Sequence, residues 1–310
     1  MSNILIIKHG SLGDLIQANG AIEDIKNSKT DSKVYLLTSF QYADFMSHCP
    51  YLDGVLIDQR KPRWNIPYFF KLKKNLSRFN FSHVFDLQNS SRTRFYKNFL
   101  LNKSIWSSTD SSLEVGQKKS DFNKDPVLDR LEIQLNKSGI KTYNIKKINL
   151  SWAFLNIDRL VKQCTSNDYI LIFPFCSKKH KKKRWPYYKE LVIKLKEIYK
   201  NKYSIIVAPG PKEILESKEL NAKVILDGDK ALNINQLISL INGSKFIVSN
   251  DTGPAHVCNH LNKNGLALFG SHTSAKKVSI GNSNFEVLTE NDLFNLSTDT
   301  VVEKIKKKLN

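Results

Sequence analysis

A short loop that ends in an aspartate is the first part of the sequence that could carry chemistry. Residues 10–14 (GSLGD) follow the apolar run ILII and precede a predicted helix near residues 14–27. Gly10 and Gly13 permit a tight turn and the close approach of a substrate. Asp14 lies where a helix dipole stabilises a carboxylate, so it can cap the helix. Alternatively, it can take part in chemistry at the open end of a sheet.

A second candidate site is the stretch FIVSNDTGPAHVCNHL, residues 246–261, in which an apolar strand runs into a helix. Thr252 is a favourable N-cap residue, and Pro254 suits the first helical turn because its missing N–H would be unpaired there. Gly253 lets a ligand approach the backbone, and His256 can add a donor. The N–H groups and the helix dipole predict an anion site suited to a diphosphate. The alternative is an ordinary capped helix with a structural histidine.

A third candidate site is the basic loop CSKKHKKKRWPYYKEL, residues 176–191, which follows the apolar run YILIFPF. Five lysines and Arg184 near the carboxyl end of a strand favour a negatively charged ligand. The alternative is a solvated loop that Trp185 anchors to the core.

The elements that must position these residues repeat along the chain. Apolar runs (ILII, KVYLLT, GVLIDQ, FSHVFDLQ) alternate with helical patterns, and the alternation restarts near residue 169 with YILIFPF, YSIIVAPG, KFIVSND and LALFG. This order predicts parallel strands with helical crossovers in two doubly wound domains, with a boundary near residues 150–168. Ligands of such sheets bind outside the carboxyl ends of the strands. Residues 102–125 are rich in Lys, Ser and Asp and predict a loop or insertion.

The composition is strongly basic. The 310 residues carry a net charge of +19, which suits nucleic acid, an acidic membrane face or a phosphorylated substrate, or only solvates the surface. No nucleic-acid module is recognisable, so no specific nucleic-acid partner is expected. Four scattered cysteines without a C-x-x-C pair predict a reducing cytosol, and no apolar run is long enough to span a membrane. The protein is therefore expected to be soluble or to rest on a membrane surface.

Two further segments each have two interpretations. Residues 58–81 mix Arg and Lys with Trp64, Tyr68, Phe69 and Phe70. Such a mixture can rest at an anionic membrane surface or cradle a phosphorylated lipid, or it can form a helix with a buried aromatic face. The D-x-D in LDGDKA, residues 226–231, resembles a metal-binding signature, but Asp-Gly-Asp is also favourable turn chemistry, and we predict a turn.

Four of these stretches, taken in order, resemble one family. IIKHGSLGD, FSHVFDLQNSSRTR, KKRWP and SNDTGPAH look like glycosyltransferase family nine, the lipopolysaccharide heptosyltransferases. The resemblance implies the α/β fold of the GT-B type, in which two Rossmann-like, doubly wound domains face a central cleft. It implies an acceptor-binding domain over residues 1–155 and a sugar-nucleotide-binding domain over residues 156–310.

The resemblance also assigns roles to residues. Asp14 matches the general base that takes a proton from the acceptor hydroxyl. Ser11, Gly13, Gln88 and Arg92 fall on the acceptor side. Asp86 and Gln88 lie at the matching places of the family's strand and loop over residues 81–94. Lys183 matches the phosphate-binding lysine. The nucleotide-diphosphate loop corresponds to Asp251, Thr252, Gly253, Pro254 and His256.

The implied function is inverting transfer of heptose from ADP-heptose to a lipopolysaccharide core or related anionic glycolipid, without a metal or other cofactor. The implied location is the cytoplasm, free or at the inner face of the cytoplasmic membrane. Two departures from the family pattern are visible. Where the family has a nucleoside-binding Glu, this chain has Lys212, with Glu213 next to it, and the loop SHTSAKK offers only Thr273 and Lys276. The alternatives are therefore another sugar nucleotide, or a catalytically silent nucleotide-binding protein of the same fold.

Overall fold

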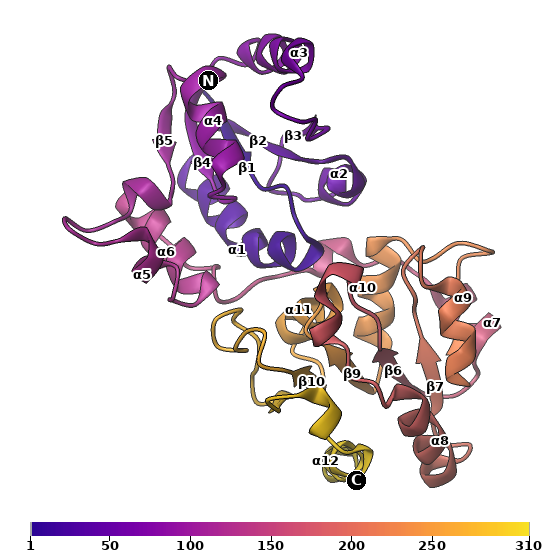
Figure 1. Cartoon of the computed structure of the whole chain (residues 1–310). Coiled ribbons are helices and arrows are strands. Elements are labelled where there is room, and N and C mark those ends of the chain that lie inside the picture. Colours follow the sequence, from indigo (N-terminus) through magenta and orange to yellow (C-terminus); the bar gives the residue numbers. More distant parts are fainter. Residues whose placement is uncertain (1, 310) are drawn as a thin grey trace. The chain divides into compact units, whose positions relative to one another are not determined.

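The chain divides into two compact units, Met1–Trp152 and Ala153–Asn310, which are coloured indigo to magenta and magenta to yellow in Figure 1. The computed structural model describes residues 2–309. Each unit is a parallel β-sheet with helices in the crossovers. Within the described residues, no helix is both long enough and apolar enough to cross a membrane.

The N-terminal unit is built on a five-stranded parallel sheet in the order β3-β2-β1-β4-β5. Its strands and helices are β1 (Ser2–Ile7), α1 (Leu12–Ser28), β2 (Ser32–Ser39), α2 (Phe40–Ser47), β3 (Gly54–Asp58), α3 (Ile66–Ser77), β4 (Phe81–Asp86), α4 (Ser91–Phe99), β5 (Ile105–Ser107), α5 (Lys119–Phe122) and α6 (Val127–Lys137). From β1 the chain moves outward to β3 and then returns to β4. Because parallel crossovers are right-handed, α1 and α2 cover one face and α3 and α4 cover the other.

The core of this unit is formed by strand residues whose side chains are buried on both faces of the sheet. Leu5 and Ile7 on β1 pack in one buried cluster with Phe69 and Leu72 of α3 and with Tyr96 of α4. The residues between them on the strand are buried as well, because both faces of the sheet are covered. The apolar run ILII is therefore a central strand, as the sequence predicts.

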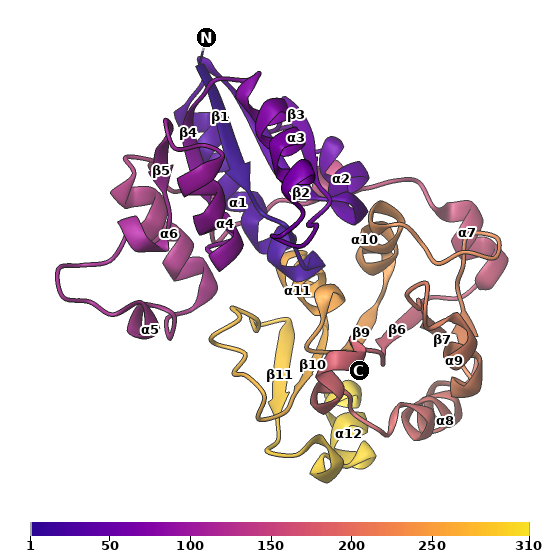
Figure 2. The ribbon, with the colours of Figure 1, turned by 45° about the horizontal axis from the view of Figure 1, so that its top comes forward.

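The C-terminal unit has a six-stranded parallel sheet in the order β11-β10-β9-β6-β7-β8. Its strands and helices are α7 (Asp158–Cys164), β6 (Tyr169–Phe173), α8 (Tyr188–Tyr199), β7 (Ser204–Val207), α9 (Ile214–Ser217), β8 (Lys223–Val224), α10 (Ile234–Gly243), β9 (Phe246–Asn250), α11 (Gly253–His260), β10 (Gly265–Phe269), β11 (Phe285–Thr289) and α12 (Thr298–Leu309). Counted within the unit, this is the strand order of dinucleotide-binding folds. Figure 2 shows α12 and α8 on the same side of this sheet, and both contribute to one buried cluster.

Most of the predicted organisation is confirmed, with specific exceptions. The sheets are parallel and doubly wound, and the Lys-rich C-terminal segment forms α12. Residues 102–125, for which the sequence predicts a loop or insertion, also contain two short elements, β5, which pairs with β4, and α5. β5 has three residues, too few for a visible periodicity. The edge strand β11 and the helix α6 were also not predicted from the sequence.

Strand order locates the part of each sheet where ligands bind. It reverses between β1 and β4 in the N-terminal sheet and between β6 and β9 in the C-terminal sheet. Ligands of doubly wound sheets bind at the carboxyl ends of the strands beside this reversal. The loops that follow these four strands hold all three candidate sites of the sequence.

Candidate functional site

The buried side chain of Asn250, at the end of β9, joins the loops that follow β6 and β9. Its amide donates to the carbonyl of Pro174 at 2.9 Å, and its oxygen accepts from the backbone N–H of Trp185 at 3.2 Å. Trp185 is fully buried, and its indole N–H donates to the carbonyl of Leu296 at 2.8 Å. The basic loop is therefore anchored at its C-terminal end, beside the strand-order reversal.

Lys183 and His272 both contact one buried carboxylate at this position. Lys183 Nζ lies 2.7 Å from Asp251 Oδ2, and His272 Nε2 lies 2.9 Å from the same oxygen. Burial by itself would raise the pKa of Asp251. The hydrogen bond and charge of Lys183, followed by smaller contributions from His272 and His256, hold its pKa below the ordinary value. The carboxylate is therefore ionised, and it positions the Lys183 ammonium at the carboxyl edge of the sheet.

Sequence reasoning did not identify His272. It lies in the loop after β10, where its ring stacks on Phe269 and its side chain is 11% exposed. The available signal was that this loop departs from the family pattern and contains a histidine. In the same loop Thr273 is half-buried and Lys276 is exposed.

The helix that follows β9 begins as predicted, but its cap differs. Thr252 occupies the N-cap position with extended backbone, yet its hydroxyl donates to the carbonyl of Asn250 instead of capping the helix. Gly253 and Pro254 form the first turn of α11, and His256 lies in the same turn with 8% of its surface exposed. Among the residues that the structure describes, no side chain caps the N-terminus of α11, so its N–H groups face the position where the dipole favours an anion.

A pocket of about 290 Å³ opens beside this helix. It is lined by the ends of β6, β7 and α11, including Phe175, Pro209, Glu213 and Thr252. The Glu213 carboxylate accepts a hydrogen bond from the backbone N–H of Gly210 at 2.9 Å, which holds it at the pocket wall. Lys212 is exposed. Of these two neighbours, the structure thus places Glu213 where a bound molecule would meet it.

In the N-terminal unit, Asp14 lies in the first turn of α1. Its Oδ2 accepts hydrogen bonds from the backbone N–H and the hydroxyl of Ser11, at 2.8 and 2.9 Å. Lys8 Nζ lies 3.5 Å from Asp14 Oδ1 and also donates to the carbonyl of Leu87 at 3.0 Å. The Asp14 side chain is 41% exposed, so the aspartate both caps the helix and presents a carboxylate to solvent. The two roles suggested by the sequence are compatible.

The loop before Asp14 requires glycine at one position. Gly10 has a φ of +100°, and a Cβ there would come within 2.2 Å of the Tyr42 ring. Gly13, in contrast, is a buried residue of α1 and makes no turn. The turn that delivers Asp14 to the sheet edge therefore depends on Gly10.

The loop after β4 supports the loop after β1. Asp86 accepts hydrogen bonds from the backbone N–H groups of Gln88 and Asn89, and Gln88 accepts one from the backbone N–H of His9 at 2.9 Å. Burial raises the pKa of Asp86. Asp86 and Gln88 therefore hold the two loops together at the carboxyl edge of the sheet.

Arg92 belongs to a buried cluster around Asp58 that the sequence did not reveal. Asp58, the last residue of β3, is 1% exposed and accepts hydrogen bonds from the hydroxyls of Tyr68 and Tyr96. His9 Nε2 lies 2.9 Å from its carboxylate and Arg92 Nε lies 3.4 Å away. Burial opposes ionisation of this carboxyl, but the hydrogen bonds from His9 and the two tyrosines hold its pKa well below the ordinary value.

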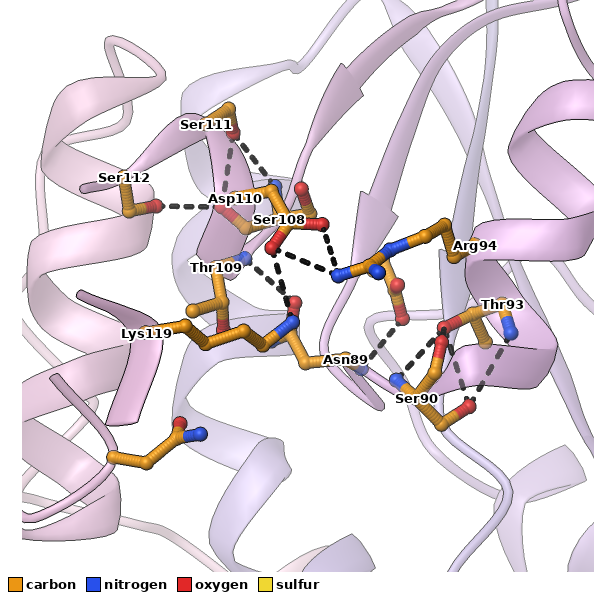
Figure 3. A network of polar contacts seen from close by, with 12 residues as sticks. Asn89, Ser90, Thr93, Arg94, Ser108, Thr109, Asp110, Ser111, Ser112 and Lys119 are labelled. Carbon is orange, nitrogen blue, oxygen red and sulfur yellow. Dashed lines mark hydrogen bonds and ion pairs between the residues drawn. The ribbon is translucent and has the colours of Figure 1, made fainter. Parts of the chain in front are cut away.

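A second polar network lies at the ends of β4 and β5 (Figure 3). Arg94 of α4 and Lys119 of α5 both point at the carboxylate of Asp110, with Nη2 and Nζ each 3.0 Å away. The side chain of Asn89 accepts a hydrogen bond from the backbone N–H of Thr109. This network ties the 108–119 segment to the edge of the sheet that carries the candidate site.

The D-x-D of the sequence forms a turn, as predicted. Asp227 and Lys230 exchange two backbone hydrogen bonds, of 2.9 and 3.1 Å, around Gly228, which has a φ of +62°. Among the residues that the structure describes, no three Asp, Glu, His or Cys side chains group together as potential metal ligands.

Comparison with known proteins places the chain in one family. The model of glycosyltransferase family 9 (heptosyltransferase) matches residues 69–305. A lipopolysaccharide heptosyltransferase 1 from Campylobacter coli is 23% identical over 308 residues, covering 89% of this chain and 87% of that protein.

Solved structures agree with this assignment. The E. coli heptosyltransferase WaaC with ADP has a TM-score of 0.73 at 17% sequence identity, and the match covers 99% of both chains. The same enzyme with ADP-2-deoxy-2-fluoro heptose also has a TM-score of 0.73 at 17% identity, and that match covers 98% of this chain and 99% of the other. The E. coli ADP-heptose LPS heptosyltransferase II has a TM-score of 0.74 at 18% identity and covers 100% of this chain and 98% of its own. The resemblance seen in the four sequence motifs is thereby confirmed: the chain belongs to glycosyltransferase family 9, the heptosyltransferases, and has their GT-B fold.

Proposed function

We propose that the protein transfers heptose from ADP-heptose to a lipopolysaccharide core or a related anionic glycolipid, with inversion at the anomeric carbon. The observation that carries the proposal is the pair of Lys183 and Asp251 at the strand-order reversal of the C-terminal sheet, next to the 290 Å³ pocket. The structurally similar E. coli heptosyltransferase WaaC has been solved with ADP and with ADP-2-deoxy-2-fluoro heptose, and this supports the same donor here.

The proposed donor site lies in the C-terminal unit. The diphosphate would bind between Lys183 and the N-terminus of α11, where Thr252, Gly253 and His256 are placed. When the bond to the sugar breaks, negative charge develops on this diphosphate. Preorganised cations and N–H groups stabilise such charge and lower the barrier, so the site supplies a role that a metal ion has in other transferases. We therefore expect transfer to be independent of added metal.

The proposed acceptor site lies in the N-terminal unit, at the carboxyl edge of its sheet. The Asp14 carboxylate would take the proton from the acceptor hydroxyl as that oxygen attacks the anomeric carbon, since a neutral hydroxyl is a poor nucleophile. Ser11 and Lys8 contact the Asp14 carboxylate and hold it in one position. The proposed place of action is the cytoplasm, where a nucleotide sugar is available.

Calorimetric binding of ADP, ADP-heptose, UDP and GDP, with and without magnesium, tests the donor half of the proposal. ADP and ADP-heptose should bind selectively and without metal. Preference for UDP or GDP would contradict the assignment of ADP-heptose as the donor, but it would be consistent with the fold and with the diphosphate site. Absence of binding to all four would contradict the assignment as a glycosyltransferase and favour a catalytically silent protein of the same fold.

In the same assay, Lys183→Ala should weaken ADP binding about tenfold to hundredfold, because it removes a charge-assisted contact to the diphosphate. The matched control is Lys194→Ala, which removes a lysine of the same unit that pairs with Glu190 and Asp299 on the surface. Unchanged affinity in the Lys183 variant would refute its role.

The nucleoside contact can be assigned with two neighbouring variants. Glu213→Gln should weaken ADP binding about tenfold, because Glu213 lines the pocket and a hydrogen bond to a charged carboxylate is stronger than one to an amide. Glutamine can still accept the bond from Gly210, so the local structure is kept. Lys212→Gln should leave the affinity within about twofold. The reverse pattern would show that Lys212 contacts the nucleoside.

A further inference from the structure

An apolar groove runs between α3 and α4 on the surface of the N-terminal unit. It has a volume of about 230 Å³ and is lined by Ile66, Phe69, Phe70, Phe95, Phe99 and Leu100, with Arg63 and Lys73 at its edge. Ile66, Phe70 and Lys73 are spaced four and three residues apart, so they share one face of α3. On α4, Phe95 and Phe99 are likewise four residues apart, and their ring centroids are 4.8 Å from each other.

Several of these apolar side chains are left in water. Phe70 is 70% exposed, Ile66 is 61% exposed and Phe99 is 58% exposed. Trp64, in the loop that leads into α3, is 80% exposed. Another side of α3 faces the core, where Leu72 packs in the buried cluster of the sheet. The helix therefore has a second apolar face beside the buried one, and exposed apolar residues that gather at one place mark an interaction surface.

The charges around the groove have one sign. Between residues 59 and 109 the sequence contains eleven Lys and Arg residues and a single acidic residue, Asp86, which is buried. Lys71, Lys73 and Lys74 are exposed on the same helix as Phe70. A short helix with aromatic residues and lysines side by side is typical of segments that lie in the interface of an anionic bilayer. A protein partner would need acidic groups and a shape that match this face. An anionic bilayer offers an apolar interior for the exposed side chains and negative headgroups for the lysines, without a defined shape.

The groove is connected to the proposed acceptor site through Arg92. The Arg92 guanidinium lies over the ring of Phe69, which lines the groove, at 5.6 Å, and its Nε is 3.4 Å from Asp58 at the carboxyl edge of the sheet. Arg63, at the edge of the groove, donates to the hydroxyl of Ser91 at the start of α4 at 2.6 Å. The contacts of Arg92 with Asp58 and Phe69 thus link the sheet edge to the groove between α3 and α4.

We propose that Trp64, Ile66, Phe70 and Phe99, with the lysines of α3, form a membrane-docking face that binds an anionic lipid bilayer. The aromatic side chains enter the headgroup region and the lysines remain at the lipid phosphates. The inference deepens the proposed function, because docking would bring the sheet edge to a membrane-embedded acceptor. It does not depend on the donor, so the binding of vesicles and the binding of nucleotides can fail separately.

The test is sedimentation of the full chain with vesicles of phosphatidylcholine, alone or with phosphatidylglycerol as about a quarter of the lipid. The protein should bind the anionic vesicles much more tightly, and raising NaCl from about 0.1 M to about 0.5 M should weaken this binding strongly. Phe70→Ser combined with Phe99→Ser should weaken it about tenfold or more. The control is Phe40→Ser on α2, which removes a phenylalanine that is 76% exposed elsewhere in the same unit.

Two double variants with the same change in net charge complete the test. Lys73→Glu with Lys74→Glu should weaken binding by at least about 25-fold, since the loss of each lysine charge alone costs about fivefold. Lys306→Glu with Lys307→Glu on α12 changes the net charge equally and should have a far smaller effect. Equal losses in the two pairs, or unchanged binding of the Phe70/Phe99 variant, would overturn the proposal. A dimer in solution that the Phe70/Phe99 variant abolishes, with no vesicle binding by the parent, would also overturn it and assign the groove to a second copy.

Discussion

Asp14→Asn should lower the rate of sugar transfer by about 10²- to 10⁴-fold and leave the affinity for ADP within about twofold. The amide cannot accept the proton of the acceptor hydroxyl, so the attacking oxygen stays neutral. Asparagine retains an oxygen that can accept the hydrogen bonds from Ser11, so the start of α1 should keep its structure. The measurements are single-turnover transfer and calorimetric binding of ADP to the same preparation.

Two further variants separate the chemical from the structural role of Asp14. Asp14→Ala removes both the base and the cap, and should lower stability by about 1 kcal/mol more than the asparagine variant does. Asp31→Asn removes an exposed carboxylate of the same unit and should leave transfer unchanged. Full transfer by Asp14→Asn would refute the assignment of the base.

Asp58→Ala should lower the free energy of unfolding by about 3–5 kcal/mol, the largest stability effect that we expect from a single substitution in this protein. The carboxylate is buried among Tyr68, Tyr96, His9 and Arg92, and its removal leaves these polar groups without their shared acceptor. Urea denaturation of the two proteins measures the difference. The control is Asp53→Ala, whose pair with Lys26 is partly exposed, and its cost should be about 1 kcal/mol or less.

The contribution of Asp58 should also depend on pH in a defined direction. Its pKa is depressed in the folded state, so its stabilisation is fully present above the unfolded value of about 4. The stabilisation is lost as the pH falls from there towards the folded pKa. The gap in stability between wild type and Asp58→Ala should therefore be constant from about pH 7 to about pH 5 and narrow below about pH 4. A gap that stays constant down to about pH 3 would show that Asp58 is not ionised in the fold.

Local pattern was sufficient to predict most strands and helices, because burial on both faces makes a parallel strand a continuous apolar run. YILIFPF and KFIVSND are such runs, and both are central strands of the C-terminal sheet. The same pattern, with the rule that ligands meet the carboxyl ends of strands, located Asp14, Lys183 and Thr252 at sheet edges. It failed at the edge strands β5 and β11, of which β5 has only three residues, because an edge strand is covered less and its pairing depends on its one neighbour.

The contacts within the sites depend on residues that are distant along the chain. Lys183 and Asp251 are 68 positions apart, and His272 approaches the same carboxylate from a third segment. Asp58 gathers side chains from the loop after β1, from α3 and from α4. No local periodicity encodes such pairs, because sheet order and crossover handedness bring them together. The residue types at the strand ends could therefore be read from the sequence, whereas their mutual contacts and their ionisation followed from packing.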